Sequence, residues 1–299
     1  MIEVNDLQKF YEDFSAVSSL TFNVYPGEIF GIIGPNGAGK STTLKMLIGL
    51  IKPTSGTIKI NGLGLSSNMV EIKSILGFLP EDSTLYENME VEEYLLFFSE
   101  LYGLDKKDAN ERIFRLLTDL SLNPYSKKIG DLSKGMKRKV AIARSLINEP
   151  DILVYDEPGS GLDPMTSNFI TEYIGQLKNE GKTIVFSAHN LYQMDKLCDR
   201  ILIIKDGKQK ALGSPGEIKK QYSNTSYRLE FVLDNNKDAE IQLKQENIFW
   251  RDDRYVLLTE NIETVNSVTK KIITSGGKIL EMSTVEPTLE DIFLRIVSS

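Results

Sequence analysis

The stretch between residues 34 and 42 has the composition of a phosphate-binding loop. It satisfies the pattern G-x-x-x-x-G-K-[ST], and its members are Gly34, Pro35, Asn36, Gly37, Ala38, Gly39, Lys40, Ser41 and Thr42. An apolar run over 29–33 precedes it and a helix-forming run over 40–50 follows, which gives the strand, loop and helix that such a site needs. Glycines let backbone N–H groups approach an anion at the helix start, where unpaired donors and the helix dipole favour phosphate. The stretch predicts nucleoside triphosphate binding, with Lys40 on the β- and γ-phosphates, the Ser41 hydroxyl on Mg²⁺ and Thr42 towards the α-phosphate.

Two adjacent carboxylates follow a short apolar run, 152–155, that is typical of a buried strand. Ligands of open α/β sheets bind beyond the carboxyl ends of the strands, so we expect Asp156 and Glu157 at the site onto which the phosphate loop opens. Asp156 is predicted to hold the hydration shell of Mg²⁺, and Glu157 to orient or deprotonate an attacking water. A tight loop then leads into a helix that Pro164 is placed to begin.

A single histidine follows the next predicted strand, 183–186, and lies 32 residues after Glu157. A lone histidine is more often structural than catalytic. At the end of a strand beside the predicted phosphate site, however, His189 can donate a hydrogen bond to a γ-phosphate, which favours a functional role.

A second anion-binding candidate begins the helix that covers residues 134–146. Ser133 is a suitable N-cap, and the apolar face of the helix is formed by Met136, Val140, Ala143 and Leu146. A helix N-terminus with a serine, a glycine and nearby cations favours an anion. A solvated basic helix start would explain this segment equally well if it stood alone.

Composition bears on the partners and the compartment of the protein. The 299 residues suffice for one large domain or two modest ones, and 35 Lys and Arg against 42 Asp and Glu give a net charge of −7. This balance has no basic excess, so no nucleic-acid partner is expected. The single cysteine, Cys198, cannot form an internal disulfide and fits a buried apolar position in a reducing compartment. No signal segment and no apolar run of about 18 residues is present, which predicts a cytoplasmic, soluble chain.

The elements that position these residues are predicted as an α/β domain over 1–222. Alternating strands over 2–7 and 18–24 form an antiparallel β-layer before the phosphate loop, and Phe10 and Tyr11 between them offer a ring face that either stacks on adenine or packs in the core. A strand over 57–61 follows, and an apolar stretch over 75–79 ends at Pro80. A helical lobe at about 84–148 contains helices over 91–102 and 110–120, separated by a charged turn at 105–108.

The remaining residues predict a small α+β accessory domain over 226–299. A hairpin turn at 206–208, a short helix over 216–222 and a polar linker over 223–226 precede it. Strands are predicted over 227–233, 239–243, 254–259 and 278–283, with helices over 262–274 and from Pro287 or Thr288 onwards. We expect a stabilising or dimer-supporting appendage, and a regulatory sensor is the alternative.

In this order, the phosphate loop, the segment 132–136, the strand with its two carboxylates and His189 resemble the nucleotide-binding subunit of ATP-binding-cassette (ABC) transporters, over roughly residues 1–220. By this resemblance Tyr11 matches the aromatic residue that stacks on adenine, and His189 the switch histidine. The loop that touches the opposite subunit corresponds to Gly161, Leu162 and Asp163. The signature segment, which binds the ATP of the opposite subunit, corresponds to Leu132, Ser133, Lys134, Gly135 and Met136.

The chain departs from the family pattern at two places. Glu81 stands where the family usually has a glutamine that ligates Mg²⁺ and senses the permease. The signature is usually Leu-Ser-Gly-Gly-Gln, and here Lys134 and Met136 replace a glycine and the glutamine. Ser133 and Gly135, which contact phosphate in the family, remain, so ATP-driven closure is expected, with Lys134 as an added cation near the partner's nucleotide. This form, and the phrase at 286–294, look like the subgroup that serves small export permeases of the drug- and antibiotic-resistance type.

The resemblance implies an ATPase that uses ATP and Mg²⁺ and drives export through a separate membrane permease. One chain carries one set of motifs, so two cassettes are needed, and a homodimer needs no extra assumption. ATP would hold the pair head to tail, and hydrolysis assisted by Glu157 would release it. The chain would lie on the inner face of the cell membrane, bound to its permease. The resemblance does not identify the exported substrate.

Two other classes of protein were weighed against this one. A soluble cassette ATPase that acts on ribosomes or DNA usually carries two cassettes or a long coiled-coil insertion, and this chain has neither. A P-loop kinase or GTPase would have no use for the Ser133 helix, and a guanine-reading Asn-Lys-x-Asp segment is missing.

Overall fold

The computed structural model describes residues 1–122, 127–222, 226–233, 248–285 and 287–298. The chain forms two compact units, one of Met1–Pro215 with Ile296–Ser299 and one of Gly216–Arg295. Helix α8 (Pro215–Tyr222) therefore falls almost wholly in the second unit, although the sequence placed it at the end of the first domain. Of the predicted linker, residues 223–225 lie outside the described part.

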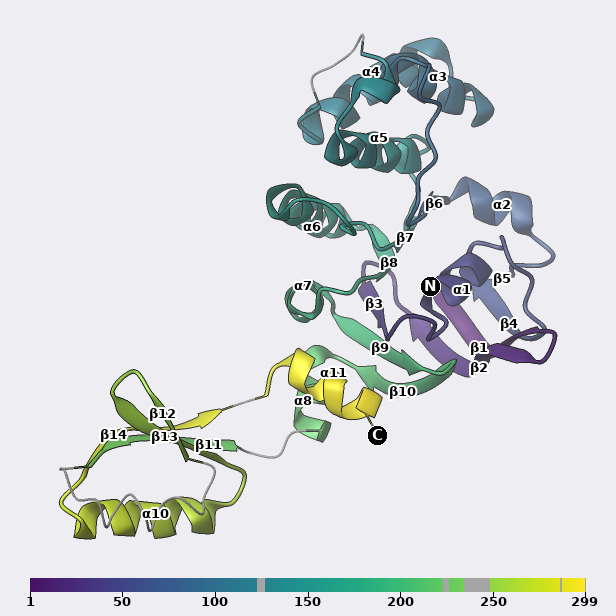
Figure 1. Cartoon of the computed structure of the whole chain (residues 1–299). Coiled ribbons are helices and arrows are strands. Elements are labelled where there is room, and N and C mark those ends of the chain that lie inside the picture. Colours follow the sequence, from purple (N-terminus) through teal and green to yellow (C-terminus); the bar gives the residue numbers. More distant parts are fainter. Residues whose placement is uncertain (123–126, 223–225, 234–247, 286, 299) are drawn as a thin grey trace. The chain divides into compact units, whose positions relative to one another are not determined.

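A six-stranded sheet forms the centre of the first unit, in the order β10-β9-β3-β8-β7-β6 (Figure 1). Its strands are β3 (Ile29–Ile33), β6 (Leu76–Leu79), β7 (Ile152–Asp156), β8 (Thr183–Ser187), β9 (Arg200–Lys205) and β10 (Lys208–Gly213). All are parallel except β10, which pairs antiparallel with β9. Every residue of β3, β7 and β8 is buried, which explains their continuous apolar sequences. Parallel pairing brings the carboxyl ends of these three strands to one edge of the sheet.

An antiparallel sheet forms a second layer, in the order β2-β1-β4-β5. It consists of β1 (Ile2–Tyr11), β2 (Phe14–Val24), β4 (Ser55–Ile60) and β5 (Leu63–Gly64). The first two strands are longer than predicted, so Phe10 and Tyr11 end β1 instead of lying between strands. Helix α1 (Lys40–Leu47) packs in the core that both sheets share, because Leu44 lies in one buried cluster with Ile2 of β1 and Val154 of β7. The helix that follows the phosphate loop is therefore anchored in the core.

The helical lobe consists mainly of α3 (Val91–Leu101), α4 (Lys106–Asp119) and α5 (Lys134–Leu146), which lie together in Figure 1. The predicted charged turn at 105–108 is wrong, because α4 already begins at Lys106. The Asp105 carboxylate accepts the backbone N–H groups of Lys107 and Asp108 at 2.9 and 3.0 Å, so these charged residues form the first helical turn. Four short elements were not predicted: β5, α2 (Met69–Ser74), the 3₁₀ turn Ile129–Asp131 and α7 (Leu191–Leu197).

Helix α6 (Pro164–Asn179) begins where the sequence predicted. The side chain of Asp163 accepts the N–H group of Thr166 at 3.0 Å, and Pro164 is the first helical residue, where its missing N–H costs nothing. The hairpin between β9 and β10 also turns at the predicted residues, Asp206 and Gly207, which both have positive φ.

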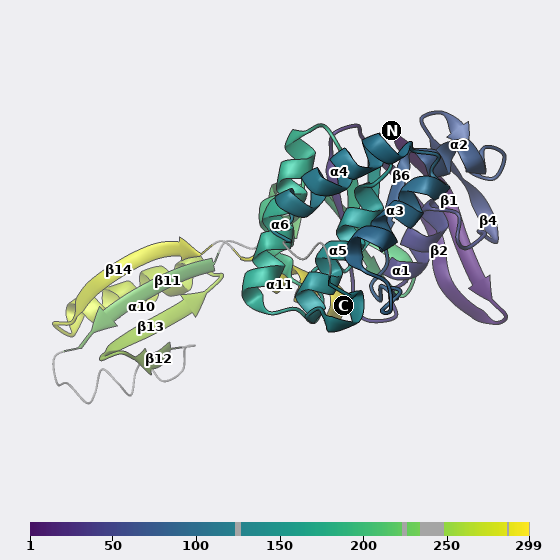
Figure 2. The ribbon, with the colours of Figure 1, turned by 90° about the horizontal axis from the view of Figure 1, so that it is seen from above.

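The second unit contains a four-stranded antiparallel sheet with one helix against it (Figure 2). Its elements include β11 (Ser226–Val232), β12 (Ile248–Arg251), β13 (Arg254–Thr259), α10 (Ile262–Thr274) and β14 (Lys278–Val285), and the strand order is β12-β13-β11-β14. Helix α11 (Leu289–Ser298) is divided between the two units, because the second unit ends at Arg295. Helix α10 has the predicted bounds and buries Val268 and Ile272 against Leu229, Phe231 and Leu257. The strand predicted at 239–243 lies outside the described residues, and β12 was not predicted.

Among the described residues, no helix has both the length and the apolar character that crossing a membrane requires.

Candidate nucleotide-binding site

The phosphate loop joins the carboxyl end of β3 to the first residue of α1. Gly37 and Gly39 have φ angles of +79° and +102°, a region that favours glycine. A β-carbon on Gly39 would lie 2.5 Å from the carbonyl oxygen of Ala16, and one on Gly34 would lie 2.3 Å from that of Ile204. No side chain in the described part of the chain caps α1. The N–H groups of its first turn thus lack a side-chain acceptor, which an anion can supply.

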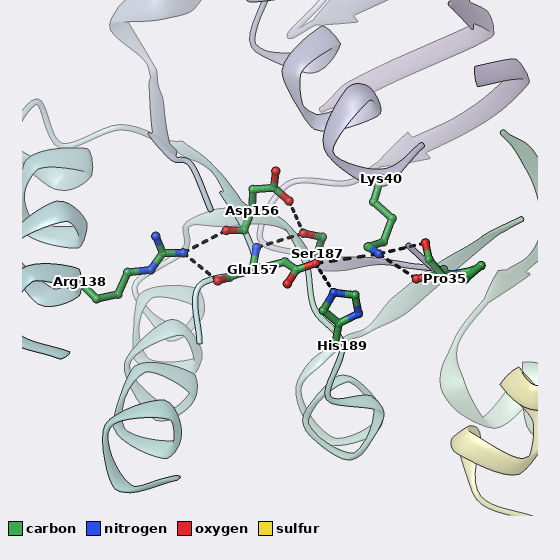
Figure 3. Close-up of polar contacts among 8 residues, drawn as sticks. Pro35, Lys40, Arg138, Asp156, Glu157, Ser187 and His189 are labelled. Carbon is green, nitrogen blue, oxygen red and sulfur yellow. Dashed lines mark hydrogen bonds and ion pairs between the residues drawn. The ribbon is translucent and has the colours of Figure 1, made fainter. Parts of the chain in front are cut away.

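Lys40 is held inside this loop. Its side chain is only 6% exposed, and its Nζ donates to the carbonyl oxygens of Gly34 at 2.8 Å and Pro35 at 3.4 Å (Figure 3). The same nitrogen lies 4.0 Å from Oε1 of Glu157. Burial lowers the pKa of Lys40, while the charges of Glu157, Asp156 and Glu81 act in the opposite direction. The ammonium group is therefore poised between the loop and the carboxylates at the strand ends.

Asp156 and Glu157 lie at the end of β7, opposite the end of β8. Their neighbour is Ser187, which pairs in register with Asp156 and donates from Oγ to Asp156 Oδ1 at 2.6 Å. The backbone N–H of Glu157 points back at Ser187, 3.1 Å from its Oγ and 3.2 Å from its carbonyl oxygen. One serine thus fixes the first carboxylate and the main chain of the second. Ser187 was not among the predicted site residues, although it stands at the end of the adjacent strand.

The carboxylate of Glu157 pairs with the predicted switch histidine. Nε2 of His189 lies 2.6 Å from Glu157 Oε1, and the histidine is half exposed whereas the glutamate is 6% exposed (Figure 3). Burial raises the pKa of Glu157, and His189 and Lys40 counteract this. A carboxylate with a raised pKa is a stronger proton acceptor at neutral pH, as a general base requires. Lys40, Asp156, Glu157 and His189 therefore form one cluster at the mouth of the phosphate loop.

The signature segment faces another part of the chain. Ser133 caps α5 by accepting the N–H group of Met136 at 3.3 Å. A β-carbon on Gly161 would lie 2.4 Å from Nζ of Lys134, so this lysine lies against the loop 161–163 of its own chain. A hollow beside them is lined by Glu81, Asp82, Lys134, Ser160 and Leu162. The ammonium group of Lys134 thus lies against the chain's own loop. Its role as a cation near a partner's nucleotide stays a prediction.

Among the described contacts, neither Tyr11 nor Glu81 bonds to a side chain of the cluster of four. Tyr11 is exposed at the end of β1, where the Nζ of Lys9 lies 4.9 Å from the centre of its ring. Glu81 is exposed in the loop after β6, yet close enough to Lys40 and Glu157 for its charge to affect the pKa of both.

The residues predicted to hold Mg²⁺ supply the right kind of ligand. The Ser41 hydroxyl lies in the first turn of α1 and the Asp156 carboxylate at the end of β7, and both are oxygen donors, which Mg²⁺ prefers. In the described residues no three His, Cys, Asp or Glu side chains gather as a metal site. Glu81, the third predicted ligand, is also an oxygen donor. An ion bound by these three residues would take phosphate oxygens and water as its other ligands, as Mg²⁺ does in nucleotide sites.

Comparison with known proteins identifies the family. A family model described as ABC transporter matches residues 17–160. Over 237 residues the chain is 39% identical to an uncharacterised ABC transporter ATP-binding protein of Methanocaldococcus jannaschii, which covers 79% of this chain and 84% of that protein. The chain belongs to the ATP-binding proteins of ABC transporters. The resemblance seen in its motifs is therefore confirmed.

Three further similarities bear on this ABC protein. It is 40% identical over 215 residues to the Nod factor export ATP-binding protein I of Burkholderia orbicola, covering 72% of this chain and 71% of that protein. A dimeric ATP-binding cassette in a post-hydrolysis state, bound to ADP and Pi, superimposes with a TM-score of 0.66 at 26% identity, over 72% of this chain and 98% of the other. This match confirms the predicted cassette fold. Residues 213–297 match a family model described as the C-terminal domain of DrrA1-3-like ATP-binding proteins.

The raised pKa of Glu157 predicts how stability depends on pH. Between the ordinary value of 4.5 and the raised folded value, the folded protein binds more protons at Glu157 than the unfolded chain does. Its contribution to stability is thus fully present below pH 4.5 and is lost as pH rises through the folded pKa.

Glu157→Gln is expected to unfold at a higher temperature than wild type at pH 7, with a smaller difference at pH 4.5. Thermal unfolding of both nucleotide-free proteins from pH 4.5 to 7.5 measures this. A difference that grows towards acid pH would contradict it.

Proposed function

We propose that this chain is the ATP-hydrolysing subunit of an ABC exporter. The observation that carries the proposal is the cluster of Lys40, Asp156, Glu157 and His189 at the mouth of the phosphate loop, because it unites a phosphate ligand, a metal ligand and a base. The ADP and Pi in the similar dimeric cassette support hydrolysis.

The side chains of the site have separate roles in this proposal. The N–H groups of the loop and the ammonium group of Lys40 bind the β- and γ-phosphates. Ser41, Asp156 and Glu81 would hold Mg²⁺, which would neutralise phosphate charge. Glu157 accepts a proton from the attacking water. His189 donates to the γ-phosphate. To do so, its Nε2 must leave the Glu157 carboxylate or contact the carboxylate and the phosphate together. Tyr11 stacks on the adenine.

A second copy of the chain completes each site. The phosphate loop and the signature segment occur once in the chain, and the signature segment contacts the chain's own loop 161–163 instead of the phosphate loop. A head-to-tail pair would place Ser133 and Gly135 of one copy on the nucleotide of the other, with residues 161–163 between the two copies. The dimeric state of the similar cassette supports this arrangement.

A membrane permease is the proposed partner. A groove between the core and the helical lobe is lined by Leu50, Leu76, Phe78, Phe98 and Tyr102, with Lys73 and Arg144 among them. Leu50 is 60% exposed and Tyr102 is 45% exposed, and an apolar surface of this kind suits a partner helix. The name of the Burkholderia relative supports export as the direction. The chain would then lie at the inner face of the cell membrane.

Purification of the tagged chain at native expression tests this function. Membranes solubilised in mild detergent are expected to yield the chain with a stoichiometric polytopic membrane protein. A variant with Leu50→Glu and Tyr102→Glu should lose this partner, and Phe114→Glu, an exposed position on α4 outside the groove, should keep it. Recovery with ribosomes, or only in soluble fractions, would contradict export and leave the ATPase assignment intact.

A further inference from the structure

Arg138 is a buried cation that the proposed mechanism does not use. It lies in the second turn of α5, five residues after Ser133, and is only 7% exposed. Desolvation lowers its pKa to about 10, so it stays charged at neutral pH. Burying a charge is costly unless polar partners surround it.

All three guanidinium nitrogens of Arg138 have acceptors in two loops. Nη2 donates to the carbonyl oxygens of Asp156 at 3.0 Å and Glu157 at 2.8 Å (Figure 3). Nε donates to the carbonyl oxygen of Pro158 at 2.9 Å. Nη1 donates to the carbonyl oxygens of Pro80 at 2.6 Å and Glu81 at 2.9 Å, and it lies 3.2 Å from the hydroxyl of Ser83. Five of these six acceptors are main-chain carbonyls, so the side chain of Arg138 fixes the backbone of residues 80–81 and 156–158.

The main chain of Glu157 is fixed from both sides by these contacts. Its φ is +47°, a region that a residue with a side chain seldom adopts and that must be held by its surroundings. Ser187 accepts its N–H group, and Arg138 donates to its carbonyl oxygen. The direction in which the Glu157 carboxylate leaves the backbone therefore depends on Arg138.

The same side chain joins Glu157 to the loop that contains Glu81. The loop 80–83 and residues 156–158 are held by opposite ends of one planar guanidinium group, and that group is carried by the helix that Ser133 caps. A shift of the loop 80–83 must break its bonds to Nη1 or move Arg138, and with it α5 and Glu157. Five fixed N–H donors make arginine suited to this, and lysine is a poor substitute.

We propose that Arg138 is a positioning residue, which sets the backbone of Glu157 and couples it to the loop 80–83 and to the signature segment. It contacts carbonyl oxygens and not the reacting groups, so it acts on turnover through Glu157. This inference rests on the proposed role of Glu157 as the base. A misplacement of about 1 Å near a reacting group can lower a rate by about a hundredfold.

Steady-state ATPase kinetics of Arg138→Met, Arg138→Lys and a control arginine test the proposal. In Arg138→Met, kcat is expected to fall about 10- to 100-fold, while KM for ATP stays within about threefold because no bond to the phosphate loop is lost. Arg138→Lys should lie between this variant and wild type. The control is Arg112→Met, since Arg112 is also part-buried and donates to a backbone carbonyl, that of Ile147 at 2.7 Å, but lies in the helical lobe. Its kcat should match wild type.

A double-mutant cycle separates positioning from general stability. Adding Arg138→Met to Glu157→Gln should lower single-turnover hydrolysis by less than about threefold, because the residue that Arg138 positions is already inactive. A purely structural role would instead multiply the two losses. If Arg138→Met fails to fold, Arg138→Lys is decisive, with a kcat about 3- to 10-fold below wild type at an unchanged unfolding temperature.

Three results would overturn the proposal: wild-type kcat in Arg138→Met, an equal loss in Arg112→Met, or multiplied losses in the cycle. Failure of the proposed function is distinguishable from these. Wild-type protein without ATPase activity, or Glu157→Gln with full activity, would refute the mechanism itself. If Glu157→Gln has the expected low ATPase rate and Arg138→Met has the rate of wild type, only the role of Arg138 is refuted.

Discussion

Glu157→Gln is expected to lower ATP turnover by about 10²- to 10⁴-fold, the contribution that a positioned general base makes. Glutamine has nearly the same shape, but its amide cannot accept the proton of the attacking water. The variant keeps the bond between Lys40 and the phosphate loop and the bond between Asp156 and Ser187, because neither involves the Glu157 carboxylate. In the described part of the chain, the only contact of Lys40 that changes is its 4.0 Å ion pair with Glu157. The affinity for ATP should therefore change little.

The same variant should accumulate the closed pair of cassettes. If ATP holds two copies together and hydrolysis releases them, a protein that binds ATP without hydrolysing it shifts the population to the dimer. Size-exclusion chromatography with ATP and Mg²⁺ measures this shift, with wild type expected as monomer. Glu149→Gln is a matched control, because Glu149 is 47% exposed and pairs with Arg112 away from the site. Hydrolysis at the wild-type rate by Glu157→Gln would remove Glu157 from the role of base.

The strands and the phosphate loop of this site were predictable because local sequence specifies them. β3 and β7 are buried on both faces, so each is a continuous apolar run that ends where its motif residues begin. The ends of α5 and α6 were likewise indicated by Ser133, Asp163 and Pro164, since capping is a local interaction. Helices α2 and α7 have six and seven residues, which is too short for a helical period to emerge from the sequence.

The contacts of Arg138 were not predictable in the same way. In the sequence Arg138 is one of several cations near the start of a helix. The residue type alone does not tell whether such an arginine is buried or solvated. A weak signal existed, because Ala141, Ile142 and Ser145 follow it at helical spacing and are buried with it. Its acceptors, however, come from loops 18 to 58 residues away along the chain, and only the packing of α5 against the sheet brings them together.

Lys40→Met is expected to weaken ATP binding at least about thirtyfold. Removing one charged partner of a buried pair costs about 2–5 kcal/mol, and 1.4 kcal/mol is a factor of about ten in affinity. Methionine keeps an unbranched apolar stem of similar length, which fits the buried position, but it removes the ammonium group that faces the phosphates. Equilibrium binding of a fluorescent ATP analogue measures the loss.

The control for this variant lies on the same helix. Lys45→Met removes a half-buried lysine from the last turn of α1, away from the loop, and should bind ATP like wild type. Thermal unfolding without nucleotide separates loss of the site from loss of the fold, because the carbonyl oxygens of Gly34 and Pro35 lose their donor in Lys40→Met. An unfolding temperature near wild type together with weak binding assigns Lys40 to the phosphates. Binding that survives would mean that the loop N–H groups and the dipole of α1 suffice to hold the nucleotide, and that Lys40 serves mainly to keep Glu157 in place.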